Sequence, residues 1–180
     1  MGCDKALLEL GRVTLLERAA RLLEGAVSRV SVIGPQRPLA NFTHSFLADD
    51  FPGAGPLGGI ATAVRAAREP WCLVVACDLP YLTRDWLDFL IGFAARSGAD
   101  AVLPANERGP EPLCAMYSRH CHAKVVASLE RGIRKVTDGL TGLRVEQLPM
   151  REWKRFDSGG GLFKNMNTPE DYQEAQAHFE

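Results

Sequence analysis

PGAGPLGGI at residues 52–60 and ACDLP at residues 76–80 are the most informative segments of this chain. Glycines and prolines directly ahead of a helical pattern form a tight loop whose backbone amides can point at an anion near the positive end of the helix. This is the geometry of a phosphate-binding loop. The apolar run WCLVVAC at residues 71–77 predicts a strand that is buried on both faces of a parallel sheet.

Asp78 directly follows the predicted strand and therefore lies at its carboxyl end. Ligands of open α/β sheets bind outside these ends, and a lone carboxylate beside a phosphate-binding loop is a natural ligand for a divalent metal ion. By itself, a Gly/Pro cluster is typical of a turn, and an Asp before Leu-Pro is typical of a turn or helix cap. The combination of the two features favours a binding site.

Helical and strand patterns alternate along the chain. Apolar stripes predict helices over residues 15–23, 57–67, 84–96 (with Thr83 as N-cap), 120–130 and from 169 towards 178. Apolar or alternating runs predict strands over residues 28–34, 45–47, 71–77, 100–104, 113–117, 143–148 and 162–166. This alternation with short connections predicts an α/β fold with a doubly wound, mostly parallel sheet, in a single domain of residues 1–180.

The composition excludes several classes of protein. A chain of 180 residues with 46% hydrophobic and 24% charged residues has the values of one globular domain. The formal net charge of −1 gives no reason to expect nucleic acid or an anionic membrane as a partner. Because no signal peptide and no apolar run of membrane-spanning length are seen, we expect a cytoplasmic protein. Five cysteines without a CxxC pair argue against disulfides and a zinc site, and Cys3 is expected to have no role.

Blocks of sequence occur in the order found in the MobA-like molybdenum cofactor guanylyltransferase family. They are MGCDKALL (1–8), PGAGPLGGI (52–60), CDLPY (77–81), EPL (111–113) and NMNTPED (165–171). The chain therefore resembles this family over nearly its whole length, which implies a Rossmann-like nucleotidyltransferase fold of the GT-A-like type. The resemblance further implies a magnesium-dependent enzyme that transfers GMP from GTP to molybdenum-bound molybdopterin and releases pyrophosphate.

The resemblance also implies roles for residues on the nucleotide side. Lys5 neutralises phosphate charge, and Asp78 binds the Mg²⁺ that bridges to the nucleotide phosphates, so both are catalytic candidates. Gly34 and Asp49 are expected to contact the guanine nucleotide, with Asp50 as the alternative to Asp49. The expected partners are GTP and molybdopterin, and then molybdoenzymes or their chaperones.

On the pterin side, the resemblance points to Asn165, Asn167 and Arg134. Arg134 belongs to a basic cluster with Arg131 and Lys135 around a glycine, which by itself is typical of a solvated face. Asn167 suits contact with the pterin or its phosphate and equally suits a cap of the helix that begins at residue 169, where Thr168 is the alternative cap.

One feature departs from the family. Its members begin with a hydrophobic strand and a loop Leu-Ala-Gly-Gly-x-Ser-x-Arg that leads into Met-Gly-x-Asp-Lys, whereas this chain begins at that Met. We expect the first strand and most of the loop to lie upstream of Met1, and the alternative is a degenerate relative. Because that strand is central in the family's sheet, residues 1–180 should show a gap there.

Two other functions stay open at this point. One is a cytidylyltransferase acting on the same pterin, although that branch usually carries a serine in the loop that here reads GPLGGI at residues 55–60. The other is a non-catalytic protein that binds only a nucleotide, a pterin or a molybdoenzyme. The bases encoding the segment upstream of Met1 would separate the enzyme from the degenerate relative.

Overall fold

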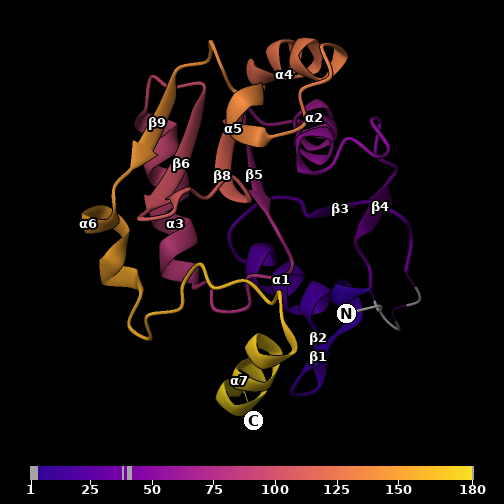
Figure 1. Cartoon of the computed structure of the whole chain (residues 1–180), viewed down its shortest axis with the longest axis vertical. Coiled ribbons are helices and arrows are strands. Elements are labelled where there is room, and N and C mark those ends of the chain that lie inside the picture. Colours follow the sequence, from indigo (N-terminus) through magenta and orange to yellow (C-terminus); the bar gives the residue numbers. More distant parts are fainter. Residues whose placement is uncertain (1–3, 38, 40–41, 180) are drawn as a thin grey trace.

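The structure, a computed structural model, describes residues 4–37, 39 and 42–179 and has an α/β architecture (Figure 1). Its strands are β1 (Glu9–Leu10), β2 (Val13–Thr14), β3 (Ser31–Ile33), β4 (Ser45–Leu47), β5 (Trp71–Val75), β6 (Ala101–Asn106), β7 (Gly109–Pro110), β8 (Cys114–Ser118) and β9 (Val145–Leu148). Residues 1–3 lie outside the described part, so the expectation for Cys3 stays a prediction.

The strands form a hairpin and two sheets. β1 and β2 make the hairpin, β3 and β4 make a parallel pair, and the remaining strands make a five-stranded sheet in the order β5-β8-β6-β7 with β9 beside β6. β8 runs antiparallel to β5 and β6, and β9 runs parallel to β6. β5, β6 and β9 therefore share one direction, and β8 and β7 are the reversed strands.

The predicted helices are confirmed to within one residue at each end. The α-helices are α1 (Leu15–Glu24), α2 (Pro56–Ala66), α3 (Arg84–Arg96), α4 (Cys121–Glu130), α5 (Val136–Gly139), α6 (Met150–Trp153) and α7 (Pro169–Phe179), with 3-10 turns η1 (Lys5–Leu7) and η2 (Lys154–Phe156). Thr83 caps α3 as predicted, accepting a hydrogen bond from the Trp86 amide at 3.4 Å. None of the helices in the described part is both long and apolar enough to span a bilayer.

Helices cover both faces of the five-stranded sheet because its strands alternate their side chains between the faces. α2 and α4 pack on the face that carries Leu103 and Tyr117. α3 packs on the opposite face, against Val102 and Met116. The two apolar cores lie on either side of the sheet and fix the position of its strand ends.

The strand predicted over residues 162–166 is wrong. This segment is irregular, and its apolar residues Leu162 and Met166 are buried anchors rather than members of a ladder. The amide of Leu162 donates to the Asp157 carboxylate at 2.9 Å, and the amide of Met166 donates to the Asp78 carbonyl at 3.0 Å. Side-chain and loop acceptors thus replace the neighbouring strand that the prediction assumed.

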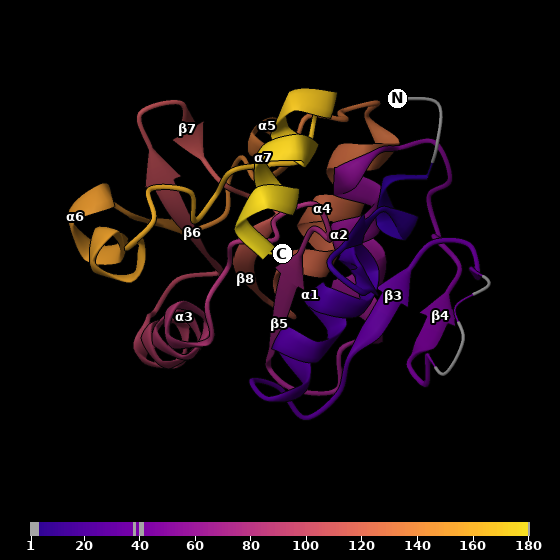
Figure 2. The same cartoon turned by 90° about the horizontal axis from the view of Figure 1, so that it is seen from below.

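No strand ladder joins β3 to β5 in the part of the chain that the structure describes. β3 and β5 lie side by side (Figure 2) but belong to separate sheets. A cavity of about 1020 Å³, lined on its two sides by residues 30–33 and 71–77, separates them, and we call it the central slot. The prediction that the strand at residues 71–77 is buried on both faces is wrong, since β5 ends at Val75 and is only half-buried along its length beside this slot.

Candidate functional site

Three predicted site residues from distant parts of the chain meet at the carboxyl end of β5. The Nζ atom of Lys5 donates a hydrogen bond to the side-chain oxygen of Asn167 at 2.9 Å. The amide of Met166 donates to the Asp78 carbonyl at 3.0 Å, which holds the segment before α7 against the strand end. The positive charge of Lys5 also acts on the Asp78 carboxyl. The fold therefore places the Lys5 ammonium, the Asp78 carboxylate and the Asn167 side-chain amide together at the carboxyl end of β5.

Asp78 is a half-buried carboxylate whose side-chain oxygens accept no hydrogen bond from another residue in the described part of the chain. Burial raises the pKa of this carboxyl above its ordinary value, and Lys5 opposes the shift. A carboxylate that is desolvated and has no donor from another residue gains from a bound cation.

A metal ion here would need further ligands from a bound molecule. No group of three or more His, Cys, Asp or Glu side chains among the described residues is arranged to hold a metal ion. Mg²⁺ is usually bound by one or two carboxylates together with substrate phosphates and waters. The single carboxylate of Asp78 fits a metal that arrives with a nucleotide and does not fit an all-protein metal cage.

An ion pair that sequence reasoning missed lies next to this edge. Arg37 donates from Nε to the Asp4 carboxylate at 2.6 Å, and this bond, as the main cause, lowers the pKa of the Asp4 carboxyl. Both residues line the central slot, and both act on the Cys77 thiol, whose pKa burial raises to about 11. In the sequence, Arg37 follows Gly34 by three positions. No pattern in the sequence links Arg37 to Asp4.

Gly34 and Asp49 lie at the carboxyl ends of β3 and β4. The Gly34 amide donates to the Leu47 carbonyl at 2.9 Å, and its φ of 135° favours glycine. The Asp49 carboxylate accepts from the Phe51 amide at 2.9 Å and from the Thr62 hydroxyl at 3.0 Å. These bonds fix the Asp49 side chain against α2.

Asp50, the alternative to Asp49, has a different partner. Its carboxylate forms an ion pair with Arg65 of α2. Each of the two carboxylates therefore has its own contact with α2, and their roles towards a nucleotide stay predictions.

The choice between capping and contact for Asn167 is resolved in part. Thr168 is the residue that caps α7, because its hydroxyl accepts from the Asp171 amide at 3.1 Å while the Asp171 carboxylate accepts from the Thr168 amide at 2.9 Å. The side-chain oxygen of Asn167 is left to Lys5. Asn165 is half-buried next to it, with its carbonyl accepting from the Asn167 amide at 3.1 Å.

Arg134 is not brought to this cluster. Its guanidinium donates to the carbonyls of Leu129 and Ile133 at 2.9 and 3.0 Å, which closes the end of α4. Within residues 4–37, 39 and 42–179, no hydrogen bond or ion pair joins Arg134 to Lys5, Asp78 or Asn167. None of the described contacts of Arg134 therefore supports a role in binding the pterin.

The family model described as "MobA-like NTP transferase domain" matches residues 1–146. The chain belongs to this family. A probable molybdenum cofactor guanylyltransferase of Methanothermobacter thermautotrophicus is 33% identical over 183 residues, which cover 95% of this chain and 90% of the relative. A protein with the same description from Pelotomaculum thermopropionicum is 30% identical over 177 residues, covering 98% and 85%.

The fold of this MobA-like domain is similar to a crystal structure of molybdopterin-guanine dinucleotide biosynthesis protein A from Archaeoglobus fulgidus. The TM-score is 0.85 at 26% identity, and the match covers 98% of this chain and 91% of the other. The GT-A-like nucleotidyltransferase fold and the family expected from the sequence blocks are thus confirmed.

Proposed function

We propose that this MobA-like domain is a molybdenum cofactor guanylyltransferase that transfers GMP from GTP to molybdenum-bound molybdopterin and releases pyrophosphate. The observation that carries the proposal is the meeting of Lys5, Asp78 and Asn167 at the carboxyl end of β5. A nucleoside triphosphate bound at this edge would meet the Lys5 ammonium, which can pair with its phosphates. It would also meet the Asp78 carboxylate, which can bind a metal ion together with those phosphates. The descriptions of the two curated relatives support the guanylyl form.

The reaction requires positioning and charge neutralisation rather than a covalent nucleophile. An oxygen of the terminal phosphate of molybdopterin forms a bond to the α-phosphorus of GTP, and the bond from that phosphorus to the pyrophosphate oxygen breaks. Mg²⁺ held by Asp78 would neutralise charge on the phosphates. Lys5, oriented by Asn167, would add a fixed ammonium to the same phosphates.

Gly55 opens α2 in a way that suits the phosphate-binding loop. It adopts a φ of 68° and precedes a helix start without a side-chain cap, which leaves the positive end of the helix dipole accessible to an anion. Gly34 and Asp49 are the residues we assign to the guanine nucleotide, and Asn165 and Asn167 to the pterin.

The competing function is that of a cytidylyltransferase acting on the same pterin. The two functions differ in whether GTP or CTP supplies the transferred nucleotide. The test is the transfer of radiolabel from α-labelled GTP or CTP to molybdopterin, with Mg²⁺ or with EDTA. We expect label transfer from GTP with Mg²⁺, with CTP at least about tenfold less efficient, a difference of about 1.4 kcal/mol. Preference for CTP would support the cytidylyltransferase, and nucleotide binding without transfer would support the non-catalytic protein.

A further inference from the structure

Glu111 is a second half-buried carboxylate at the edge of the five-stranded sheet where Asp78 lies. β5 and β8 run antiparallel, and Val75, the last residue of β5, pairs with Cys114, the first residue of β8. Asp78 follows Val75 by three positions, and Glu111 precedes Cys114 by three positions. In an antiparallel pair these two directions coincide, so both carboxylates lie beyond the same end of the sheet.

The backbone around Glu111 is held in place. Its amide donates to the Pro104 carbonyl of β6 at 2.8 Å, and its carbonyl accepts from the Cys114 amide at 3.3 Å. Pro110 and Pro112 flank it, and proline both fixes its own φ and keeps the residue before it extended. The segment ahead of β8 therefore presents the Glu111 side chain from a backbone with little freedom.

One oxygen of the Glu111 carboxylate is oriented by a neighbour and the other is free. The Nδ2 atom of Asn106 donates to Oε1 at 2.5 Å, and the Oδ1 atom of Asn106 accepts from the Arg108 amide at 2.7 Å. Oε2 accepts no hydrogen bond from any described residue and is not a buried atom. Burial raises the pKa of the Glu111 carboxyl, and the bond from Asn106 opposes this shift. A ligand that supplies further donors would stabilise the ionised carboxylate.

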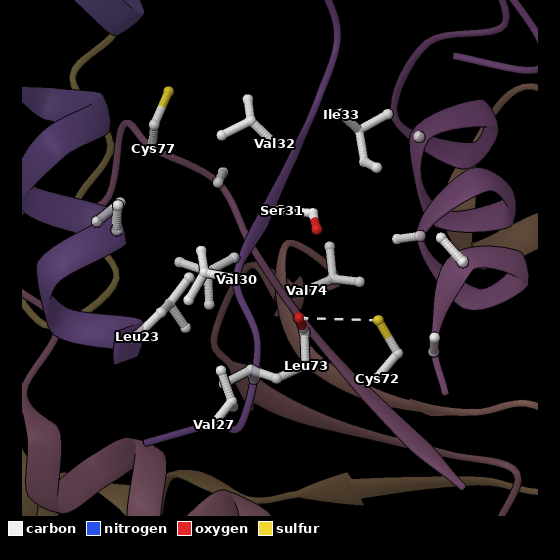
Figure 3. Close-up of a pocket in the computed structure, with 18 of the residues that line it drawn as sticks. Leu23, Val27, Val30, Ser31, Val32, Ile33, Cys72, Leu73, Val74 and Cys77 are labelled. Atoms are coloured by element: carbon white, nitrogen blue, oxygen red, sulfur yellow. Dashed lines mark hydrogen bonds between the residues drawn. The ribbon is translucent and has the colours of Figure 1, made fainter. Parts of the chain in front are cut away.

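Glu111 and the residues expected to contact the nucleotide lie on opposite sides of Asp78. β8 and β6 follow β5 on one side. On the other side, across the central slot (Figure 3), lie β3 and β4 with Gly34 and Asp49 at their carboxyl ends. Because the entering and leaving oxygens of phosphoryl transfer lie roughly in line, the two substrates must approach the metal from different directions. The side of Glu111 therefore suits the acceptor better than GTP.

The end of the pterin that lies away from its phosphate is a 2-amino-4-oxopyrimidine. Its N3–H and its 2-amino group donate side by side, and a carboxylate can accept such a pair with its two oxygens. Each carboxylate oxygen accepts up to two hydrogen bonds, so Oε1 of Glu111 can keep its bond from Asn106. Guanine carries the same edge, and this chemistry is shared by both substrates. Asn167 lies at Lys5, beside the expected phosphates, so the pyrimidine end of the pterin needs a partner elsewhere along the sheet edge.

We propose that Glu111 recognises the pterin of the acceptor, with its two carboxylate oxygens accepting from N3–H and the 2-amino group, and that Asn106 positions this carboxylate. The identity of the acceptor rests on the proposed function. The phosphate of the same molecule would lie at Asp78 and Lys5. Neighbouring strands are about 4.8 Å apart, so an extended tricyclic molecule can reach from the end of β5 to the segment that holds Glu111.

Glu111→Gln tests this recognition in the transfer reaction, because the amide keeps an acceptor for Asn106 but replaces the second acceptor by a donor. We expect KM for molybdopterin to rise by about tenfold or more, as for loss of a hydrogen bond to a charged group, and KM for GTP to stay at the parent value. Glu107→Gln changes an exposed carboxylate of the same hairpin and is the matched control, with both KM values unchanged.

A binding measurement makes the test independent of transfer. Pterin and lumazine, in which a 2-oxo group replaces the 2-amino group, are titrated by their own fluorescence with the full chain, Mg²⁺ and a non-reacting GTP analogue. We expect the parent chain to bind pterin at least about tenfold more tightly than lumazine. Glu111→Gln should lose or reverse this preference, because a carboxylate repels the 2-oxo group whereas an amide donates to it. Asn106→Ala should weaken pterin binding by a smaller factor, since it only frees the carboxylate to move.

The outcomes separate this proposal from the proposed function. A parent chain that transfers no GMP but prefers pterin over lumazine would remove the transfer reaction and leave Glu111 as the pterin contact. A parent chain without this preference, or a preference that survives Glu111→Gln, would overturn the role of Glu111 whether or not GMP is transferred. A shift of Glu111→Gln from GTP towards XTP, whose base carries the same 2-oxo group, would also overturn it, because Glu111 would then contact the guanine.

Discussion

Lys5 and Asn167 are joined by a 2.9 Å hydrogen bond although 162 positions separate them in the chain. The bond connects η1, at the start of the described chain, with the residue just before the cap of α7. Asp78 lies between them in the sequence, and its carbonyl holds the amide of Met166. The two ends of the chain therefore close around the carboxyl end of β5, and the geometry of the site depends on both.

The first prediction concerns this bond. Lys5→Ala should lower the rate of GMP transfer by about 100-fold, as expected for loss of a fixed cation at a phosphate. Asn167→Ala should lower it by about tenfold, because Lys5 loses the acceptor that orients it. The double variant should lose no more than Lys5→Ala alone, since both changes remove the same positioned ammonium.

The control for this pair is Gln147→Ala, an exposed residue of β9, which should transfer GMP at the parent rate. Single-turnover rates and circular dichroism of each variant separate positioning from misfolding. Strictly multiplicative losses in the double variant would mean that Asn167 does not act through Lys5.

The second prediction concerns the metal. Asp78→Asn should raise the Mg²⁺ concentration needed for half-maximal transfer and lower the maximal rate by about 100-fold or more, because the neutral amide is a weak ligand for a hard cation. Asp88→Asn, which removes an exposed partner of Arg84 at 2.8 Å, is the matched control. The measurement is the rate of transfer over a Mg²⁺ titration. An Asn variant that reaches parent activity at low Mg²⁺ would remove Asp78 from the metal site.

The third prediction compares adjacent glycines of α2. A Cβ on Gly58 would lie 3.0 Å from the Phe51 carbonyl oxygen, whereas a Cβ on Gly59 meets nothing within 4 Å. Gly58→Ala should therefore destabilise the fold, because the backbone after β4 cannot move easily. Gly59→Ala should stabilise it by about 0.5–1 kcal/mol, the usual helix preference for Ala over Gly. Urea denaturation gives both values, and a common sign for the two variants would contradict the predicted packing of the loop on α2.

The sequence predicts local elements well and long-range relations poorly. The extent of α3 follows from Thr83 and an amphipathic stripe, both of which are local. The antiparallel direction of β8 cannot be predicted from local sequence. The mostly apolar run Cys114–Ser118 is compatible with either direction until it pairs with β5 and β6. Periodicity likewise suggested a strand at residues 162–166, where burial of single side chains in an irregular segment decides the structure instead.

The candidate site divides in the same way. Asp78 is predictable because a strand end and a following Leu-Pro mark its position along the chain. The ion pair of Asp4 with Arg37 is not, since it joins η1 to the turn after β3 through a contact 33 positions apart. Arg134 was assigned to the pterin side through the family resemblance, yet its guanidinium donates to the carbonyls at the end of α4. Pairings between distant side chains require the fold before they can be assigned.

The last prediction concerns the pH dependence of stability through Asp100, which precedes β6. Its carboxylate accepts from the Arg144 amide at 2.9 Å and from the Arg144 guanidinium at 3.2 Å. The backbone bond, followed by the side-chain bond, lowers the pKa of the Asp100 carboxyl below its ordinary value of 3.8. Asp100 thus links the start of β6 by hydrogen bonds to Arg144, the residue before β9.

The sign of the effect follows from this lowered pKa. The folded state binds the proton of Asp100 less tightly than the unfolded state, so the stabilisation is complete above the ordinary pKa and is lost as pH falls through the lower folded-state pKa. Asp100→Asn should therefore lower the melting temperature at pH 7 by about 2–4 °C, the shift expected for about 1 kcal/mol at this size. The difference from the parent chain should shrink below about pH 4.

Glu130→Gln, an exposed carboxylate at the end of α4, is the control and should melt like the parent at both pH values. Differential scanning calorimetry between pH 3 and 7 provides the comparison, at constant ionic strength because Arg144 is exposed and salt screens its charge. If the melting temperature of Asp100→Asn stays below that of the parent by the same amount down to pH 3, the lost contact acts through its geometry and not through the charge of Asp100. The link between β6 and β9 would then not rest on the ionised carboxylate.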